Sequence, residues 1–525
     1  MAPSKKICNK IDTCKIVVFD VMGGLLLRPY VHPNYRFKHL EAITNTPAPF
    51  FTRERIKAEK EIVKSYKNNV ALLADIYKKI SPKYKHIYPK EKYIEQHCVI
   101  PNPDVKAMYD YAKSKRKQIV MVYNGNLDIP EIRQVLTKHK YNKQSKIYHC
   151  GVASRTAREA LFKQIAKDFD APNKDIIYLT NIKNAKVKDI DIIDTGNIID
   201  EFITKHPHLK QKNNSVGNSI ILALNALHWK FHEKEKSYFY HIGYRYGGIL
   251  AYGYARYIEQ IAVHHNLEML LFVARDGYSL KKVFETFNTK IKAKYVYAPR
   301  VLNILGYLDY NPKNKLEIQL ISNHFGIPVN KVEQYITNNK EEMMKIFAPQ
   351  RENFNKYLRK IIGRHKEIGI VDTNSIFLSS QKLISRIVDT FGIYWFIMNK
   401  QYTKQLKYNS AIKHTTPNNS NIWPLIEILL TSPEPPICWV NEKGKPVYSS
   451  KIAGHEKYKS EKYLEITHGI QDFANDVKKI FGFNNICISV NDIVNWLNAF
   501  IGNPSTLDKK QMRQIYLGYD QGHTK

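Results

Sequence analysis

The sequence predicts an α/β protein with a parallel sheet in its first domain, followed by a second α/β domain and a helical tail. In both halves of the chain, short runs of β-branched and apolar residues alternate with segments of helical periodicity, as in parallel sheets whose strands are joined by helices. The 525 residues exceed what one core normally holds. A polar stretch at residues 206–215 is typical of a linker. We therefore expect domains at 1–205 and 206–450 and a helical region at 451–525.

The first domain is expected to hold a five-stranded sheet with a helical insertion. Residues 31–110 are polar with helical spacing, which suits a small cap placed between the first two strands. Helices are expected to begin near Pro130, where a proline stands at a first-turn position, and to cover residues 157–169. The strand candidates are residues 15–20, 117–123, 146–150, 175–180 and 191–193.

The second domain repeats this alternation. A helix is expected at residues 216–232, and an amphipathic helix at 278–287. The chain then becomes mainly helical beyond residue 451. The strand candidates are residues 269–274, 294–297, 367–371 and 393–398.

The composition is strongly basic, with 81 Lys and Arg residues against 48 Asp and Glu, a formal net charge of +33. Such a charge suits an anionic partner, either nucleic acid, a membrane surface, or phosphorylated sugars and lipids. The basic residues are spread along a chain that is also rich in Ile, Asn and Tyr, which favours a compositional origin.

The cysteines and the apolar segments indicate the cellular compartment. The six cysteines form no Cys-x-x-Cys pair, which favours reduced thiols over disulfides or a zinc site. The sequence has neither a signal-peptide-like start nor an apolar run of the roughly 20 residues that a membrane span needs. We expect a cytoplasmic protein, with a peripheral position at the inner membrane face as a variant of this expectation.

A first group of polar residues follows the strands of the first domain. Asp20 ends the opening strand and is followed by Gly23-Gly24, Asn124 follows the second strand, and Asn181 follows the fourth. In this order, residues 12–200 resemble the haloacid-dehalogenase-like (HAD) phosphohydrolase superfamily. The resemblance implies that Asp20 is the nucleophile, that Arg158 or Lys163 stands for the phosphate-binding lysine, and that the fold has a small cap.

Several positions depart from that family's pattern. Gly23 is taken as the position of the second, acid/base aspartate, Asn124 replaces the hydroxyl, and Asn181 and Lys186 replace the acidic Mg²⁺ ligands. Because Mg²⁺ needs oxygen ligands of high charge, we expect the metal site and phosphatase activity to be lost, with no cofactor and with Asp20 as a relic. Two interpretations remain open. We favour a scaffold, and the alternative is that Arg158, Lys183 and Lys186 hold a phosphorylated ligand without hydrolysing it.

A second group of polar residues follows the strands of the second domain. Residues 244–250, 271–278 with Arg275-Asp276-Gly277, 371–381 and 427–436 resemble large HAD-like proteins of bacterial surface-polysaccharide and glycosylation gene clusters, which extends the resemblance over nearly the full chain.

Each residue of this second group has a functional and a structural interpretation. Arg275 could pair with a phosphate, Asp276 or Asp372 could act as base or hydroxyl ligand, and Ser375, Ser379 and Ser380 could form an anion cradle. In the structural interpretation, Arg275 and Asp276 form an ion pair that stabilises a turn, and Asp372 caps the helix that follows it. For Glu427 we favour the polar face of a helix over a second carboxylate.

These observations give one leading function and two alternatives. We expect a protein of surface-glycan or glycoconjugate synthesis whose second domain binds, and could transfer, a phosphorylated or nucleotide-linked sugar, with an anionic lipid carrier or membrane surface as a further partner. The first alternative is a non-enzymatic basic protein that binds nucleic acid or a protein, although the sequence shows no RNA-recognition, helix-turn-helix or zinc signature. The second is a metal-dependent phosphatase acting through Asp20.

Overall fold

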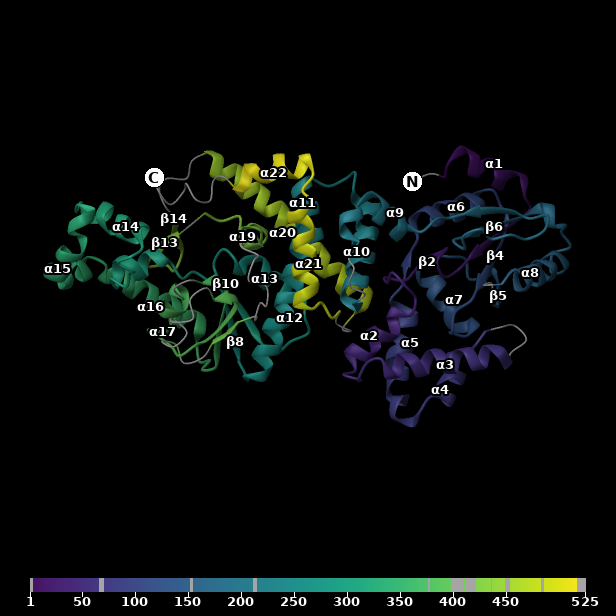
Figure 1. The fold of residues 1–525 in the computed structure, drawn as a ribbon, viewed down its shortest axis with the longest axis horizontal. Helices are drawn as coiled ribbons and strands as arrows, with labels where there is room; N and C mark the ends of the chain where they lie inside the picture. Colours follow the sequence, from purple (N-terminus) through teal and green to yellow (C-terminus); the bar gives the residue numbers. More distant parts are fainter. Residues whose placement is uncertain are drawn as a thin grey trace. The chain divides into compact units, whose positions relative to one another are not determined.

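The chain forms two compact units in the computed structural model, which describes residues 3–65, 70–151, 154–210, 215–375, 378–397, 406, 409–411, 422–435, 437–448, 454–482 and 486–516 (Figure 1). The first unit comprises residues 1–234 and 477–488, and the second comprises 235–476 and 489–525. This division differs from the expected boundaries, because residues 206–234 group with the first unit and most of the helical tail groups with the second. Residues 211–214 of the expected linker lie outside the described residues.

The first unit contains a five-stranded parallel sheet, as the sequence predicts. Its strand order is β5-β4-β1-β6-β7, so the order reverses direction at β1. All four neighbouring pairs are parallel. The strands are β1 (Ile16–Asp20), β4 (Gln118–Tyr123), β5 (Lys146–His149), β6 (Ile176–Thr180) and β7 (Asp191–Asp194).

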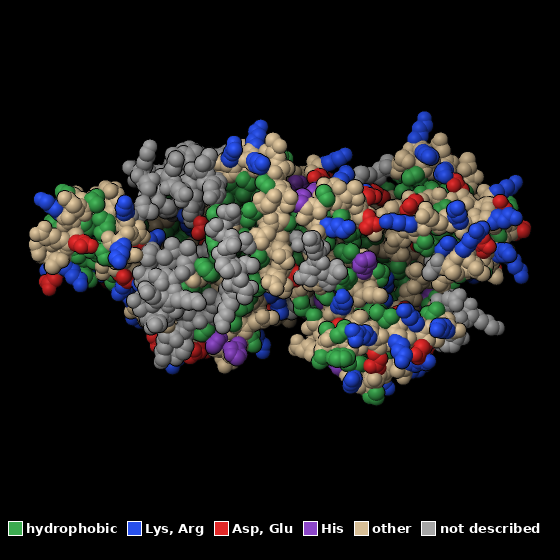
Figure 2. All heavy atoms as spheres, in the orientation of Figure 1, with side chains coloured by type: hydrophobic (Ala, Val, Ile, Leu, Met, Phe, Trp, Pro, Cys, Tyr) green, Lys and Arg blue, Asp and Glu red, His purple; other side chains and the backbone are tan. Residues whose placement is uncertain are grey.

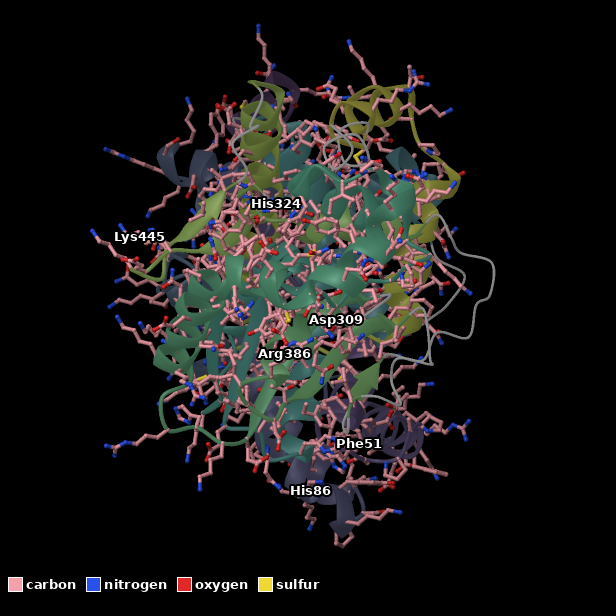
Figure 3. The ribbon with its side chains drawn as sticks, turned by 90° about the vertical axis from the view of Figure 1, so that its left-hand side faces the viewer. Phe51, His86, Asp309, His324, Arg386 and Lys445 are labelled. Atoms are coloured by element: carbon pink, nitrogen blue, oxygen red, sulfur yellow. The ribbon has the colours of Figure 1, made fainter. Side chains whose placement is uncertain are left out.

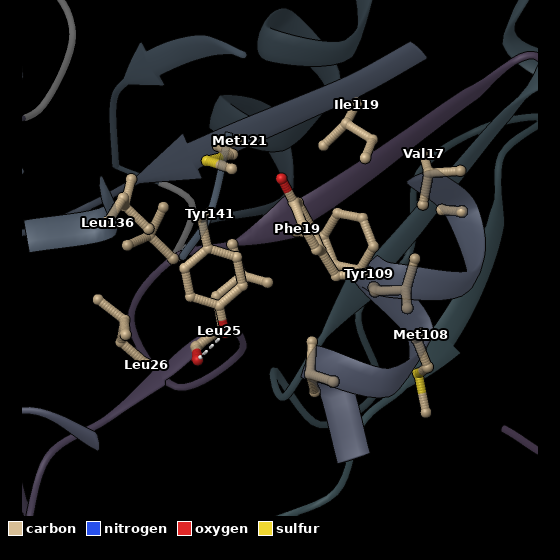
Figure 4. Packing of buried hydrophobic residues seen from close by; sticks show 14 of the residues in the cluster. Val17, Phe19, Leu25, Leu26, Met108, Tyr109, Ile119, Met121, Leu136 and Tyr141 are labelled. Atoms are coloured by element: carbon tan, nitrogen blue, oxygen red, sulfur yellow. Dashed lines mark hydrogen bonds between the residues drawn. The ribbon is translucent and has the colours of Figure 1, made fainter. Parts of the chain in front are cut away.

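Both faces of this sheet are buried, which explains why its strands are continuously apolar. Val17 and Phe19 of β1 point into one core cluster, and Val18 points into the cluster on the other face. Figure 4 shows the first cluster, where the Tyr141 hydroxyl donates a hydrogen bond of 2.9 Å to the carbonyl oxygen of Leu25. This bond fixes the glycine turn that follows Asp20.

The described part of the first unit also contains α-helices, some of which form the insertion between β1 and β4. The predicted helical insertion at residues 31–110 contains α2 to α5 and most of α6, and its strand β3 (Ile100–Pro101) pairs in antiparallel fashion with β2 (Leu26–Leu27), which precedes the insertion. The helices are α1 (Lys5–Thr13), α2 (Tyr35–Ile43), α3 (Phe50–Ser65), α4 (Leu73–Lys79), α5 (Tyr88–His97), α6 (Pro103–Ser114), α7 (Ile129–Lys138), α8 (Arg155–Asp168), α9 (Ile198–Lys205) and α10 (Val216–His232).

Asn126 joins the helical insertion to the sheet. It lies three residues beyond β4 and is buried. Its side-chain nitrogen donates to Glu59 and to the carbonyl oxygen of Ala71, both at 2.9 Å, and its side-chain oxygen accepts from Arg55 at 3.2 Å. Its backbone oxygen accepts from the amide of Leu73 at 2.7 Å. The insertion is therefore fixed to the carboxyl end of β4 by buried polar contacts.

The second unit contains another five-stranded parallel sheet, in the order β12-β11-β10-β8-β9. Every neighbouring pair is parallel. Numbered along the chain, this is the doubly wound order 2-1-3-4-5 read from the other edge, and it reverses direction between β8 and β10. The strands are β8 (Met269–Val273), β9 (Lys292–Val296), β10 (Ile368–Ser375), β11 (Phe391–Ile397) and β12 (Asn409–Ala411).

Helices and a hairpin complete the second unit. The hairpin is β13 (Ile437–Val440) with β14 (Pro446–Tyr448). An ion pair joins Arg386, the residue after α17 (Ser379–Ser385), to Asp309 at 2.9 Å (Figure 3). The helices are α11 (Tyr238–Ile242), α12 (Gly248–His264), α13 (Gly277–Phe284), α14 (Lys315–Phe325), α15 (Val332–Ile346), α16 (Ala348–Ile362), α17 (Ser379–Ser385), α19 (Ile422–Leu430), α20 (Gly454–Phe481, its last turn in the first unit), α21 (Val490–Gly502) and α22 (Thr506–Tyr516), with π-helical turns at Gly243–Gly247 and Leu302–Gly306.

Two surface properties bear on the expected partners. Within the described part of the chain, no helix is both long and apolar enough to cross a membrane. Lys and Arg side chains are scattered over the face drawn in Figure 2, with Asp and Glu between them.

Candidate functional site

Asp20 lies at the carboxyl end of β1, where the first sheet reverses direction. The hydroxyl of Tyr178 donates to one of its carboxylate oxygens at 2.6 Å, and the hydroxyl of Thr180 donates to the other. Both donors come from the neighbouring strand β6. Burial raises the pKa of Asp20 to about 6, against the opposing effect of these two hydrogen bonds. Asp20 is thus a buried carboxyl group, and hydroxyl groups of the protein donate to both of its oxygens.

The glycine turn after Asp20 has no room for an acid at Gly23. Gly23 has a φ of +86°, and a Cβ atom there would stand 2.4 Å from the side-chain nitrogen of Asn181. The acid/base position of the family pattern is Met22 and not Gly23, because the second aspartate of that pattern stands two residues after the first. The side chain of Met22 packs against the core. Neither position carries a carboxyl group.

The other predicted residues of the first site are only partly brought together. Arg158 of α8 is buried, and its charge lowers the pKa of Asp20. Asn124 and Lys186 are exposed, as is Lys163. Lys183 is exposed and pairs with Asp200 at 3.1 Å.

The donor set around Asp20 does not fit the Mg²⁺ ion that the resemblance implies. One carboxylate faces two hydroxyl donors and the charge of Arg158, while Asn181 contributes an amide. A hard divalent ion prefers several carboxylate or carbonyl oxygens. We therefore derive no metal-dependent step at this site.

The second unit presents two carboxyl groups at its own point of strand reversal. Asp276 follows β8 by three residues, and Asp372 lies in β10, where Val371 pairs with Phe272 of β8. The crevice beyond the carboxyl ends of two such strands is the usual ligand site of a doubly wound sheet. We call Asp276 and Asp372 the carboxyl pair.

Thr373 bridges the carboxyl pair. Its hydroxyl donates to a carboxylate oxygen of Asp276, and its backbone amide donates to a carboxylate oxygen of Asp372 at 2.9 Å. Ser380 of α17 donates a further side-chain hydrogen bond to Asp372. The hydroxyl of Tyr254 donates to the backbone oxygen of Asp372 at 2.5 Å. Both acids keep some exposed surface within this network.

Asp276 affects the titration of Asp372. Burial first, and then the nearby negative charges of Asp276 and Glu427, raise the pKa of Asp372 to about 7, against the hydrogen bonds from Thr373 and Ser380. Burial also raises the pKa of Asp276, while Thr373 and the charge of Arg275 lower it. A pair of coupled acids that retains a proton near neutral pH is equipped for general acid–base chemistry.

Arg275 occupies a strained position between strand β8 and Asp276. Its φ is +78°, which is uncommon for a residue with a long side chain. The hydroxyl of Tyr295 accepts a hydrogen bond from its backbone amide at 3.0 Å and so stabilises this conformation. Backbone strain of this kind is concentrated at functional sites. Its cation lies near Asp276, whose pKa it lowers.

The predicted serine cradle is only partly present. Ser380 contacts Asp372. Ser379 begins α17 and is half-buried. The side chain of Ser375, and residues 376 and 377, lie outside the described residues. Glu427 lies on α19, and its charge acts on Asp372, so it belongs to the surroundings of the carboxyl pair.

Sequence reasoning missed four residues of this site. Thr373 had a usable signal, because a hydroxyl directly follows the acid Asp372. The fourth is Glu434, which accepts a hydrogen bond of 3.1 Å from the Tyr295 hydroxyl. Tyr254, Tyr295 and Glu434 gave no signal, because they come from a helix, another strand and a loop that approach the site only in the folded chain. Across the described residues, no three His, Cys, Asp or Glu side chains are grouped so that they could hold a metal ion.

The comparisons with known proteins add no assignment to this geometry. No family model matches the chain, and no curated protein matches its sequence.

Proposed function

We propose that the second unit binds a phosphorylated or nucleotide-linked sugar at the carboxyl pair and transfers the sugar, in surface-glycan or glycoconjugate biosynthesis. The observation that carries this proposal is the placement of two coupled acids, Asp276 and Asp372, at the strand reversal of a doubly wound sheet, beside the cation of Arg275. The biosynthetic context rests on the resemblance to large HAD-like proteins alone.

The proposed chemistry divides the roles among three residues. Arg275 binds the phosphate, because a guanidinium matches phosphate oxygens with two parallel donors. The ionised member of the carboxyl pair accepts the proton of an acceptor hydroxyl. The hydroxyl oxygen bonds to the anomeric carbon, the bond from that carbon to the phosphate oxygen breaks, and the electron pair leaves with the phosphate that Arg275 holds.

The first unit takes no part in this proposed chemistry. We propose that it is a HAD-like domain whose catalytic site has degenerated, because both oxygens of Asp20 accept hydrogen bonds from β6 and no second carboxyl follows in the glycine turn. It then serves as scaffold or docking surface. We therefore expect no Mg²⁺-dependent hydrolysis of a generic phosphate ester, either by the unmodified chain or by Asp20→Asn.

A thermal-shift panel tests the proposal. The panel holds sugar nucleotides, sugar 1-phosphates and short nucleic acids, with the full chain and with Arg275→Ala. We expect a sugar compound to raise the melting temperature of the full chain. Its affinity for Arg275→Ala should be lower by roughly tenfold or more, since a charge-assisted hydrogen bond contributes about 1.5–3 kcal/mol.

The matched control is Arg359→Ala, which removes an exposed arginine of α16 in the same unit. It should bind as the unmodified chain does. Absence of stabilisation by every sugar compound, or equal stabilisation of the Arg275→Ala variant, contradicts the proposal.

A further inference from the structure

A cluster of tyrosines surrounds Glu434 beside Arg275. The Glu434 carboxylate accepts hydrogen bonds from the hydroxyls of Tyr295 at 3.1 Å and Tyr297 at 3.3 Å, one on each oxygen. The ring of Tyr295 contacts the rings of Tyr278 at 5.7 Å and Tyr297 at 5.6 Å between centroids, and Tyr297 contacts Tyr357 at 6.3 Å. We call these four tyrosines and Glu434 the tyrosine cluster.

The tyrosine cluster is continuous with the carboxyl pair. The same Tyr295 hydroxyl that donates to Glu434 accepts the backbone amide of Arg275. Asp276 is the next residue along the chain. Glu434 is therefore separated from the backbone of the predicted phosphate-binding residue by one hydroxyl group.

The members of the tyrosine cluster remain partly accessible. All five residues are half-buried. Burial raises the pKa of Tyr295 and Tyr297, so their hydroxyls remain donors at neutral pH. Among the described residues, Glu434 has no ion pair with a basic side chain, and each of its oxygens keeps lone-pair capacity beyond the tyrosine bond.

A carboxylate in this state selects neutral hydroxyl donors. Its two oxygens can accept two adjacent hydroxyl groups of a ring at once, as an acidic residue accepts ribose hydroxyls in dinucleotide-binding folds. Half-buried tyrosine rings offer flat apolar surface with a polar edge, which suits the faces of a sugar ring. A phosphate attached to that ring then falls to the neighbouring Arg275.

We propose that the tyrosine cluster is the subsite that binds the vicinal hydroxyls of a sugar ring, with Glu434 as the acceptor and the attached phosphate at Arg275. This inference rests on the function proposed above and adds to it the part of the ligand that each residue recognises. The hydroxyl-bearing ring is either a hexose or the ribose of a nucleotide, since both present the same diol chemistry next to a phosphate.

Calorimetric titration with defined probes tests the subsite. The probes are glucose 1-phosphate, uridine 5′-monophosphate, its 2′,3′-dideoxy analogue and inorganic phosphate, applied to the full chain and to Glu434→Gln. We expect Glu434→Gln to bind the preferred diol-bearing probe about tenfold more weakly, because a hydrogen bond to a charged acceptor is lost. Its affinity for inorganic phosphate should stay within about twofold.

Two further arms identify the ring and exclude a folding artefact. If the ribose is the ligand, the dideoxy analogue binds the full chain about as weakly as uridine 5′-monophosphate binds Glu434→Gln, and a hexose ligand shows instead as a preference for glucose 1-phosphate. Tyr297→Ala, which removes ring surface beside Glu434, should lower the affinity for the same probe whose affinity Glu434→Gln lowers. Glu442→Gln, an exposed acid in the β13–β14 turn, should leave all affinities unchanged.

The outcomes separate this inference from the proposed function. Unchanged affinity of Glu434→Gln for a diol probe that the full chain binds overturns the subsite and leaves the proposed function standing. Failure of the full chain to bind any phosphorylated sugar overturns both. Equal weakening of inorganic phosphate and of the diol probe in Glu434→Gln also overturns the subsite, because the loss is then not specific to hydroxyl groups.

Discussion

At the scale of single residues, Asp20 of the first sheet and Asp372 of the second differ in what surrounds them. Asp20 has a hydroxyl donor on each oxygen and the charge of Arg158 nearby. Asp372 has a backbone amide and Ser380, but also the negative charges of Asp276 and Glu427. Like charges raise a carboxyl pKa and opposite charges lower it. This difference makes Asp372, rather than Asp20, the acid that titrates nearest to neutral pH.

The raised pKa of Asp372 makes stability depend on pH. Its pKa moves from 3.8 to about 7 on folding, so between these values the folded chain retains a proton that the unfolded chain has released. The free energy of unfolding therefore falls as pH rises through this window, by up to about 1.4 kcal/mol per pH unit for this group.

Asp372→Asn isolates this contribution. Because asparagine does not titrate, the variant should lose about 2 kcal/mol less stability than the unmodified chain between pH 5 and pH 7, measured by urea unfolding. Asp389→Asn, which removes an exposed aspartate of the same unit, is the control. Parallel losses in Asp372→Asn and the unmodified chain would show that Asp372 titrates normally.

Gly23 is a second residue whose role can be measured. Gly23→Ala places a side chain at a φ of +86° and against Asn181. We expect a loss of about 2 kcal/mol or more in the free energy of unfolding, since the left-handed conformation alone costs about 1–2 kcal/mol. The double variant with Asn181→Ala should recover the part caused by the contact.

Gly326→Ala is the matched control for strain without a clash. Gly326 has a φ of +67°, and no atom lies within 4 Å of its added Cβ. Its loss should be smaller than that of Gly23→Ala. Equal losses at the two glycines would mean that Asn181 does not restrict the turn after Asp20.

At the scale of elements, the helical insertion is held by buried charges. The guanidinium of Arg55 on α3 bonds to Glu91 on α5, with Nε to the carboxylate oxygens at 2.9 and 3.2 Å and Nη2 at 2.8 Å. Glu91 also accepts from the Tyr77 hydroxyl of α4 at 2.7 Å. Both members of the ion pair have fully buried side chains. Through Asn126, the same arginine reaches the end of β4.

Breaking this buried pair should be costly. Glu91→Gln leaves the charge of Arg55 without its main partner, and we expect a loss of about 3 kcal/mol in the free energy of unfolding. Glu352→Gln is the control, because it breaks a solvent-exposed pair with Lys356 on α16 and should leave the free energy of unfolding nearly unchanged. A small loss in Glu91→Gln would indicate that the insertion is not fixed by this network.

At the scale of the whole molecule, the basic residues behind the net charge of +33 do not gather into one patch on the face shown in Figure 2. Basic and acidic side chains are interspersed there. We therefore expect only weak, non-specific nucleic-acid binding, driven by counterion release. Fluorescence anisotropy with a short labelled strand should show affinity falling by about tenfold or more between 50 and 200 mM KCl. Nanomolar to micromolar binding that falls steeply as salt rises would favour the nucleic-acid alternative.

The sequence was sufficient to predict the α/β class, the parallel sheet of the first unit and the helical insertion. Strands buried on both faces are continuously apolar, and the helices between them keep their periodicity, so most elements are visible locally, although the short strand β12 was not predicted. The position of Asp20 at the end of β1 could be predicted for the same reason, whereas β10 continues three residues beyond Asp372, where its predicted strand ends. The sequence could not show that Asn126 would be buried and Asn124 exposed, because only the packing of α3 and α4 determines which of the two amides is buried.

The contacts around the carboxyl pair could not be predicted. Thr373 bridges two strands, and Tyr295 reaches Arg275 from a third. Such contacts depend on strand order, and periodicity gives no information about the order of parallel strands. The coupling of Asp276 with Asp372 follows from the adjacency of β8 and β10, which are about 100 residues apart along the chain.

The central claim is that the second unit, and not Asp20, holds the working site. Calorimetric titration of a sugar nucleotide into the full chain, Arg275→Ala and Asp20→Asn tests it most directly. We predict that Arg275→Ala weakens binding by about tenfold or more, because a charge-assisted hydrogen bond to phosphate is lost, and that Asp20→Asn binds within about twofold of the full chain. Loss of binding in Asp20→Asn, with Arg275→Ala unaffected, would contradict the claim and return the function to the first sheet.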